Sequence, residues 1–174
     1  MARFDSSGVT AAPEAAEPAG GPMSLALAEA ESAGVRGEVP VGAVVVEPAT
    51  GRVLARAGNQ VEALGDPTAH AEILAIRAAV LGLRGAGEGA RDGRWLDGMD
   101  LHVTLEPCAM CAAAISLARV RRHYFGAYDP KGGGVEHGPR LFTQPTCLHR
   151  PEVYGGIDER RAGALLKAFF QARR

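Results

Sequence analysis

Hydrophobic and polar positions along the chain predict alternating strands and helices. Residues 41–46 form a short apolar run rich in β-branched side chains, which is typical of a buried strand. Turn residues at 47–51 and a second run at 52–57 complete a predicted hairpin. Two further apolar runs, at 101–105 and 122–126, predict two more buried strands.

Helical spacing of apolar residues fills the intervals between these strands. Four helices are predicted, at 22–34, 70–83, 108–118 and 158–174, with Asp158 as the cap of the last. Gly82–Gly98 is rich in glycine and charge and predicts a loop, and residues 129–156 are expected to be mostly irregular. The order hairpin, helix, strand, helix, strand, helix predicts a three-layer α/β fold.

Composition divides the chain into a tail and one domain. Residues 1–21 are rich in Ala, Pro, Gly and Ser without a hydrophobic period, so we expect a disordered N-terminal tail followed by a domain at 22–174. The chain lacks an apolar run of about 18 residues and an apolar signal segment. Three cysteines make a poor disulfide framework and favour a metal site in a reducing compartment, and we expect a cytoplasmic protein.

Charge is distributed unevenly behind a net value of −1. Residues 1–100 hold 8 basic and 14 acidic side chains, whereas residues 101–174 hold 11 basic and 6 acidic ones. A basic C-terminal half is suited to phosphate binding, although exposed arginines also serve to keep a glycine-rich and alanine-rich chain in solution.

Two short fragments carry candidate chemistry. Cys108 and Cys111 form a C-x-x-C pair at a predicted helix start, and His70 stands at the start of another predicted helix. One imidazole and two thiolates form a three-ligand zinc set that leaves a position open for water. Glu72 lies about 200° around the helix axis from His70, so its carboxylate is free to move protons beside an activated water.

Each fragment by itself has more than one interpretation. A C-x-x-C pair also occurs in redox sites, but the thioredoxin-like context is missing here. A structural zinc site needs a fourth ligand, for which the remaining candidates are His102, His123, His137, Cys147 and His149. The two fragments together favour hydrolytic deamination, because a structural site has no need of Glu72.

The sequence resembles the bacterial tRNA-specific adenosine deaminases of the cytidine deaminase-like superfamily. The H-x-E and P-C-x-x-C motifs of zinc deaminases are present as His70-Ala71-Glu72 and Pro107-Cys108-Ala109-Met110-Cys111. The resemblance covers about residues 23–174 and extends to the segments 38–43, 66–73, 104–111, 125–129, 149–150 and 165–170.

This resemblance implies a fold, a reaction and a site. The fold is a five-stranded mixed sheet between helices, typically in a homodimer, and the reaction converts adenosine to inosine at the wobble position of a tRNA anticodon, with tRNA-Arg as the expected partner. By position, one Zn²⁺ is held by His70, Cys108 and Cys111, and Glu72 is the proton shuttle. The implied substrate contacts are Asn59, Asp129, His149, Arg150, Phe170 and Arg173.

Two segments depart from the family pattern and leave the substrate open. Gly82–Gly98 is longer than usual, and residues 131–148 keep little of the usual sequence on the RNA side. The same zinc chemistry serves deaminases of a free base or nucleoside such as guanine, cytosine or adenosine. A structural zinc module, an inactive RNA-binding relative and an engineered deaminase acting on single-stranded DNA also remain compatible with the motifs.

Overall fold

The computed structural model describes residues 21–87 and 93–173. The predicted tail at 1–21 lies outside the described residues except for Gly21, the first residue of helix α1. In chain order the elements are α1 (Gly21–Val35), β1 (Gly42–Glu47), β2 (Arg52–Gly58), α2 (Val61–Leu64), α3 (Ala71–Ala86), β3 (Asp100–Leu105), α4 (Ala109–Leu117), β4 (Arg122–Ala127), a 3₁₀ helix (Leu141–Thr143), β5 (Glu152–Tyr154) and α5 (Glu159–Gln171).

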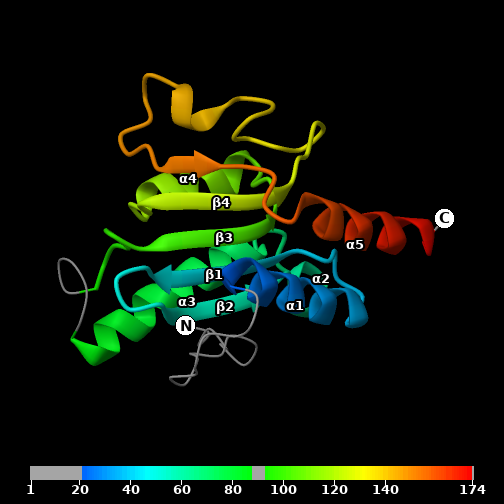
Figure 1. Ribbon diagram of the computed structural model, residues 1–174, viewed down its shortest axis with the longest axis horizontal. Coiled ribbons are helices and arrows are strands. Elements are labelled where there is room, and N and C mark those ends of the chain that lie inside the picture. Colours follow the sequence, from blue (N-terminus) through cyan, green and yellow to red (C-terminus); the bar gives the residue numbers. More distant parts are fainter. Residues whose placement is uncertain (1–20, 88–92, 174) are drawn as a thin grey trace.

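The strands form one mixed sheet in the order β2-β1-β3-β4-β5 (Figure 1). Strand β1 pairs antiparallel with both β2 and β3, whereas β3, β4 and β5 run parallel to one another. Parallel neighbours need a crossover, and α4 supplies the one between β3 and β4. The expected five-stranded mixed sheet is therefore confirmed.

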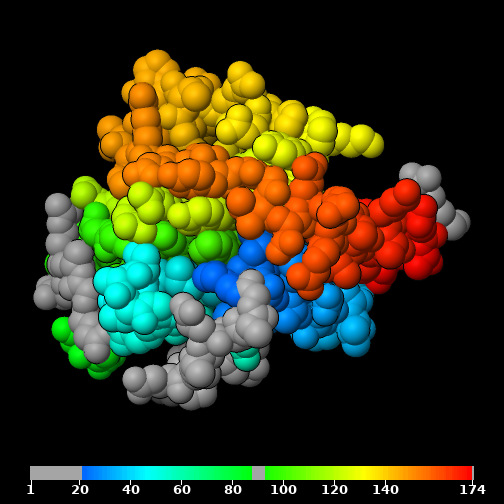
Figure 2. Space-filling model, viewed as in Figure 1, coloured from blue at the N-terminus to red at the C-terminus, as the bar shows by residue number. Residues whose placement is uncertain are grey.

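Helices cover both faces of the sheet, which confirms the predicted three-layer arrangement. Helices α1 and α5 lie side by side on one face, and α3 and α4 pack on the other (Figures 1 and 2). The larger apolar core lies on the α3 and α4 side, and a smaller core lies beneath α1 and α5. No helix in the described part of the chain is long and apolar enough to cross a membrane.

Helix α1 packs unusually close to the sheet because β1 begins with a glycine. A Cβ atom on Gly42 would lie 2.0 Å from the carbonyl oxygen of Ala26 in α1. The main-chain N–H of Gly42 donates a hydrogen bond of 3.1 Å to Oγ1 of Thr104 in β3. Through Gly42, α1 therefore packs directly against β1, which is itself hydrogen-bonded to β3.

The loop predicted at Gly82–Gly98 is wrong over residues 84–86, where helix α3 extends beyond its predicted end at Leu83. The helix continues to Ala86 because buried Leu83 packs in the core, while Gly82 and Gly85 face open space and are tolerated. It ends where Gly87 adopts a left-handed conformation with φ of 68°. Residues 88–92 of the predicted loop lie outside the described residues.

Strand β5 is the one regular strand inside the segment expected to be mostly irregular. It has three residues and gains its hydrogen bonds by pairing with β4 at Arg122, His123 and Tyr124. Three residues are too few to show a hydrophobic period, so the strand is defined by its partner. The 3₁₀ helix precedes it, and the rest of residues 129–156 is irregular as predicted.

Candidate functional site

A cavity of about 700 Å³ opens beside the N-termini of α3 and α4. A volume of this size is typical of sites for small organic ligands. Its lining comes from several separate parts of the chain: Gly37, Glu38, Val39, Val41, Asn59, Val61, Glu62, Pro67, His70, Glu72, Leu105, Glu106, Cys108, Asp129, Gly132, Phe169 and Arg173.

Two helices begin at this cavity, and the candidate metal ligands occupy their first positions. His70 and Cys108 are the N-cap residues of α3 and α4, and both have extended backbone conformations. Cys111 is buried in the first turn of α4. The free N–H groups and the positive end of a helix favour thiolate over thiol at such positions.

The three ligand atoms are spaced as zinc requires. Nδ1 of His70 lies 3.8 Å from Sγ of Cys108 and 3.5 Å from Sγ of Cys111. In a tetrahedral site with Zn–N of about 2.0–2.1 Å and Zn–S of about 2.3 Å, nitrogen and sulfur are about 3.5–3.6 Å apart. These are also the only residues that form such a cluster in the described ranges 21–87 and 93–173. The donor set and its spacing therefore fit one zinc ion.

The three side chains of the cluster shift one another's pKa values because they lie in contact. A hydrogen bond from Cys111, followed by the influence of His70, lowers the pKa of the Cys108 thiol to about 4. The hydrogen bond with Cys108, together with burial, raises the pKa of the Cys111 thiol. The hydrogen bond to Cys108 raises the pKa of His70.

Glu72 places a buried carboxyl group in the same cavity. It stands in the first turn of α3, its residue surface is 3% exposed, and it lines the cavity with His70 and Cys108. Burial raises the pKa of this carboxyl group above its usual range. A carboxyl group with a raised pKa beside a water-activating centre can both accept and donate a proton.

Asn59 projects into the cavity from the end of the β1–β2 hairpin. Its Nδ2 donates to Oε2 of Glu38 at 3.2 Å, and both side chains are buried. The Glu38 carboxylate also accepts the main-chain N–H groups of Glu62 and Ala63 at the start of α2. Because Glu38 holds the amide nitrogen, the carboxamide of Asn59 has a defined orientation toward a ligand.

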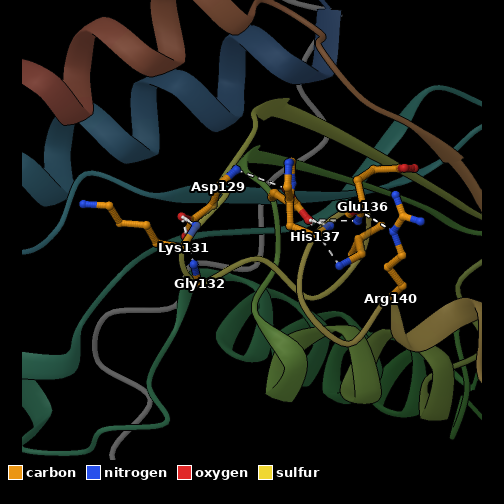
Figure 3. A network of polar contacts seen from close by, with 8 residues as sticks. Asp129, Lys131, Gly132, Glu136, His137 and Arg140 are labelled. Atoms are coloured by element: carbon orange, nitrogen blue, oxygen red, sulfur yellow. Dashed lines mark hydrogen bonds and ion pairs between the residues drawn. The ribbon is translucent and has the colours of Figure 1, made fainter.

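Asp129 lines the cavity from the segment after β4. Its Oδ1 accepts the main-chain N–H groups of Lys131 and Gly132, at 3.1 Å and 3.0 Å (Figure 3). The main-chain N–H of Asp129 donates to Oε2 of Glu106 at 3.0 Å. Asp129 thus forms an Asx-type turn whose backbone is held from behind by a buried carboxylate.

Phe169 in helix α5 and Arg173, two residues beyond the end of that helix, line the edge of the cavity. The Arg173 guanidinium lies 3.6 Å from the centroid of the Phe169 ring and donates to the carbonyl oxygen of Gly37. Phe170 contacts Phe169 edge-on but is 51% exposed and lies outside the cavity lining. Of the two phenylalanines, Phe169 is the one that lines the cavity.

His149 and Arg150 lie away from this cavity. His149 pairs through Nε2 with the carbonyl oxygen of Val120, and Arg150 donates to that of Gln144. His149 instead lines a second hollow of about 460 Å³, which it shares with residues including Leu117 and Leu148. The structure therefore brings Asn59, Asp129 and Arg173 to the metal ligands but not His149, Arg150 or Phe170.

Sequence reasoning missed three residues of the site. Glu38 and Glu106 lie within motif segments but received no role, and Phe169 was not chosen as a site residue. Each of the two glutamates stands beside a predicted buried strand, and this position could have indicated a structural role. A carboxylate that is buried there needs hydrogen-bond donors. No local signal separates Phe169 from Phe170.

The comparisons with known proteins agree with this geometry. Residues 20–127 match the family model of the cytidine and deoxycytidylate deaminase zinc-binding region. A tRNA-specific adenosine deaminase of Agrobacterium fabrum is 56% identical over 152 residues, which cover 87% of this chain and 93% of that protein. One of Bacillus subtilis is 43% identical over 150 residues, covering 86% of each chain.

A similar solved structure comes from studies of A-to-I editing by tRNA:A34 deaminases at the wobble position of transfer RNA. It is 56% identical, covers 83% of this chain and 98% of that chain, and has a TM-score of 0.75. A guanine deaminase from Nitrosomonas europaea has a TM-score of 0.71 at 22% identity, covering 91% of this chain and 87% of that chain, which shows a shared fold alone.

The fold and the His-Cys-Cys cluster with its buried carboxyl group define a zinc-dependent deaminase, with zinc as the cofactor. Within that class, the chain belongs to the family of tRNA-specific adenosine deaminases.

Proposed function

We propose that this protein hydrolyses adenosine to inosine at the wobble position of a tRNA anticodon. The observation that carries the proposal is the buried carboxyl group of Glu72 in a cavity that His70 and Cys108 also line. This combination would hold a metal ion and an attacking water beside a proton carrier in one cavity. The relatives named as tRNA-specific adenosine deaminases supply the substrate class.

The proposed mechanism assigns proton transfer to Glu72. Zinc held by His70, Cys108 and Cys111 supplies activation of the attacking water when it is bound. The Glu72 carboxylate accepts a proton from this water as oxygen attacks the amine-bearing carbon of adenine, and passes it to the adjacent ring nitrogen. The carboxylate then takes the second proton from the hydroxyl group that the attack leaves on this carbon and delivers it to the amino group. The bond between carbon and the amino nitrogen breaks, ammonia leaves, and the hydroxyl oxygen becomes the carbonyl oxygen of inosine.

Further cavity residues are proposed to bind the base and its flanking nucleotides. The carboxamide of Asn59, oriented by Glu38, is placed to hydrogen-bond the base. Asp129 and Arg173 line the cavity, where they meet the ribose and phosphate of the reacting nucleotide. Phe170, His149 and Arg150 lie outside the cavity, and their proposed contacts are with nucleotides beyond the reacting base.

The substrate is tested by presenting RNA and free compounds to the same enzyme. Zinc-loaded protein is incubated with a tRNA-Arg anticodon stem-loop carrying adenosine at the wobble position, and separately with free adenosine, guanine and cytidine. Inosine in the stem-loop alone is the expected result. Turnover of a free compound with an unchanged stem-loop would overturn the RNA substrate while retaining the zinc chemistry. A stem-loop from a second tRNA tests the assignment to tRNA-Arg.

The role of Glu72 is tested by Glu72→Ala. We expect full zinc content and a loss of activity of about 10³-fold, because the proton carrier is removed and the ligands remain. Glu31→Ala, on the exposed side of α1, is the matched control and is expected to match the unmodified protein. Loss of zinc together with activity in Glu72→Ala would show that Glu72 is a ligand.

We further propose that the protein is a cytoplasmic homodimer. Leu117 and Leu148 are 75% and 97% exposed and both border the second hollow, so this apolar surface suits contact with a second copy. Free cysteines at the metal site are typical of proteins in a reducing compartment such as the cytoplasm. Light scattering is expected to give the dimer mass, and Leu117→Arg with Leu148→Asp the monomer mass. A monomer without these substitutions would refute the dimer.

A further inference from the structure

Glu106 carries a buried carboxylate with five hydrogen-bond partners. Its Oε1 accepts the main-chain N–H groups of Val135 (3.3 Å), Glu136 (2.8 Å) and His137 (2.9 Å). Its Oε2 accepts the main-chain N–H of Asp129 at 3.0 Å and lies 2.7 Å from Nδ1 of His137. With its side chain 0% exposed, Glu106 has these groups in place of water.

These partners span one continuous segment, residues 129–137. Figure 3 shows Asp129 and Gly132 toward one end of this segment and Glu136 and His137 toward the other. The two ends come together because both donate to the same carboxyl group. Glu106 therefore determines the shape of this segment from inside.

The same segment lies directly on the turn that carries a metal ligand. The main-chain N–H of Gly134 donates to the carbonyl oxygen of Pro107 at 2.8 Å, and Gly133 pairs with Cys108 in an isolated β-bridge. A Cβ atom on Gly134 would lie 2.8 Å from the carbonyl carbon of Cys108. A Cβ atom on Gly133 would lie 2.5 Å from Cδ of Glu106, so glycines permit this close packing.

The opposite side of the segment forms part of the substrate cavity, through Asp129 and Gly132. The main chain of Asp129 is held by Glu106, and the side chain of Asp129 in turn holds the N–H of Gly132. A displacement of the segment would therefore move this part of the cavity wall relative to the metal ligands. No described atom of Glu106 has to touch the reacting base for this to matter.

We propose that Glu106 is a positioning residue that fixes the Asp129–Gly132 wall of the cavity in register with the metal-ligand turn, and so determines how tightly the substrate binds. The inference rests on the proposed function for its RNA substrate. The proposed positioning of the cavity wall by Glu106 applies to any substrate that binds in this cavity.

Glu106→Gln tests the proposal, because the amide keeps the size of the side chain but presents an NH₂ group to N–H donors. We expect one zinc per chain, an unchanged absorption spectrum after cobalt substitution, and a KM for the stem-loop raised roughly ten-fold, with kcat lowered less than about three-fold. The cobalt spectrum reports on the Cys108 and Cys111 thiolates independently of turnover.

Asp100→Asn is the matched control for loss of a buried carboxylate. Asp100 is 5% exposed and makes a two-fold hydrogen bond with Arg121, far from the cavity lining. We expect this variant to lose stability with KM and kcat unchanged. A Glu106→Gln variant that also loses stability but keeps the original KM would overturn the proposal, since its role would then be only structural.

His137→Ala provides a second variant if Glu106→Gln does not fold. It removes one of the five partners and leaves the main-chain N–H in place, and the His137 side chain is 35% exposed. A KM increase of roughly two- to five-fold is expected, and an unchanged KM in this folded variant would overturn the proposal. If the unmodified protein converts a free compound and not the stem-loop, the proposed substrate fails, and the same KM comparison is made with that compound.

Discussion

His123 is a buried histidine, and its burial in the folded state disfavours the protonated form. It is the second residue of β4, paired with Leu101 of β3 and Val153 of β5, and its residue surface is 0% exposed. Burial, followed by the influence of neighbouring His102, lowers the pKa of His123 to about 3. An unfolded chain returns this side chain to water, where its pKa is about 6.5.

The direction of the pH effect follows from these two values. Between pH 6.5 and pH 3 the unfolded chain binds a proton at His123 that the folded chain does not. The contribution to stability is therefore complete above pH 6.5 and is lost as the pH falls toward 3. Between pH 8 and pH 5 this residue alone lowers the free energy of unfolding by about 2 kcal/mol.

Urea unfolding of His123→Leu at pH 8 and pH 5 measures this contribution. Both proteins are studied without metal, so that protonation of the zinc ligands contributes equally to each. The stability difference between the two pH values is expected to be smaller in His123→Leu than in the unmodified protein by about 2 kcal/mol. Phe125→Leu, two residues along the same strand, should lose stability equally at both pH values. An unaltered pH dependence in His123→Leu would refute the reasoning.

Three further outcomes are expected. Cys111→Ser removes a zinc ligand and should abolish stoichiometric zinc, measured by mass spectrometry, together with turnover; zinc retained in this variant would refute the ligand assignment. Gly126→Ala places a Cβ atom 2.5 Å from the carbonyl oxygen of Thr104 and should cost about 1–3 kcal/mol in urea unfolding. No loss of stability there would refute the close approach of β3 to Gly126. Removing residues 1–20, which precede helix α1, should leave stem-loop deamination nearly unchanged, and a large decrease would contradict their assignment as a tail.

The candidate metal ligands and the candidate proton carrier were predictable because they lie in short sequence motifs. His70 with Glu72, and Cys108 with Cys111, are separated by two and three positions, and each pair shares one helix start. Helical geometry converts such spacings into side chains with defined directions. The register of the sheet and the shape of the cavity have no comparable local signal.

Residues whose role depends on partners far away in the sequence could not be predicted from the sequence. Glu106 takes its donors from positions 23 to 31 residues later, within a segment that shows no period of its own. Strand β5 has only three residues, and it is a strand because it pairs with the edge of β4. Phe169 lines the cavity while Phe170 faces outward, because the packing of α5 against β4, and not the sequence of the pair, sets the rotation of the helix.

The sequence by itself predicted the candidate metal ligands, the candidate proton carrier and most of the helices and strands, since these depend on side-chain chemistry and periods of a few residues. Only the tertiary structure decided which aromatic ring borders the cavity, which carboxylate shapes its wall, and that His149 and Arg150 lie on another surface. The physical reason is that burial and hydrogen-bond partners arise when remote segments meet, and buried polar groups take whichever partners the fold brings to them.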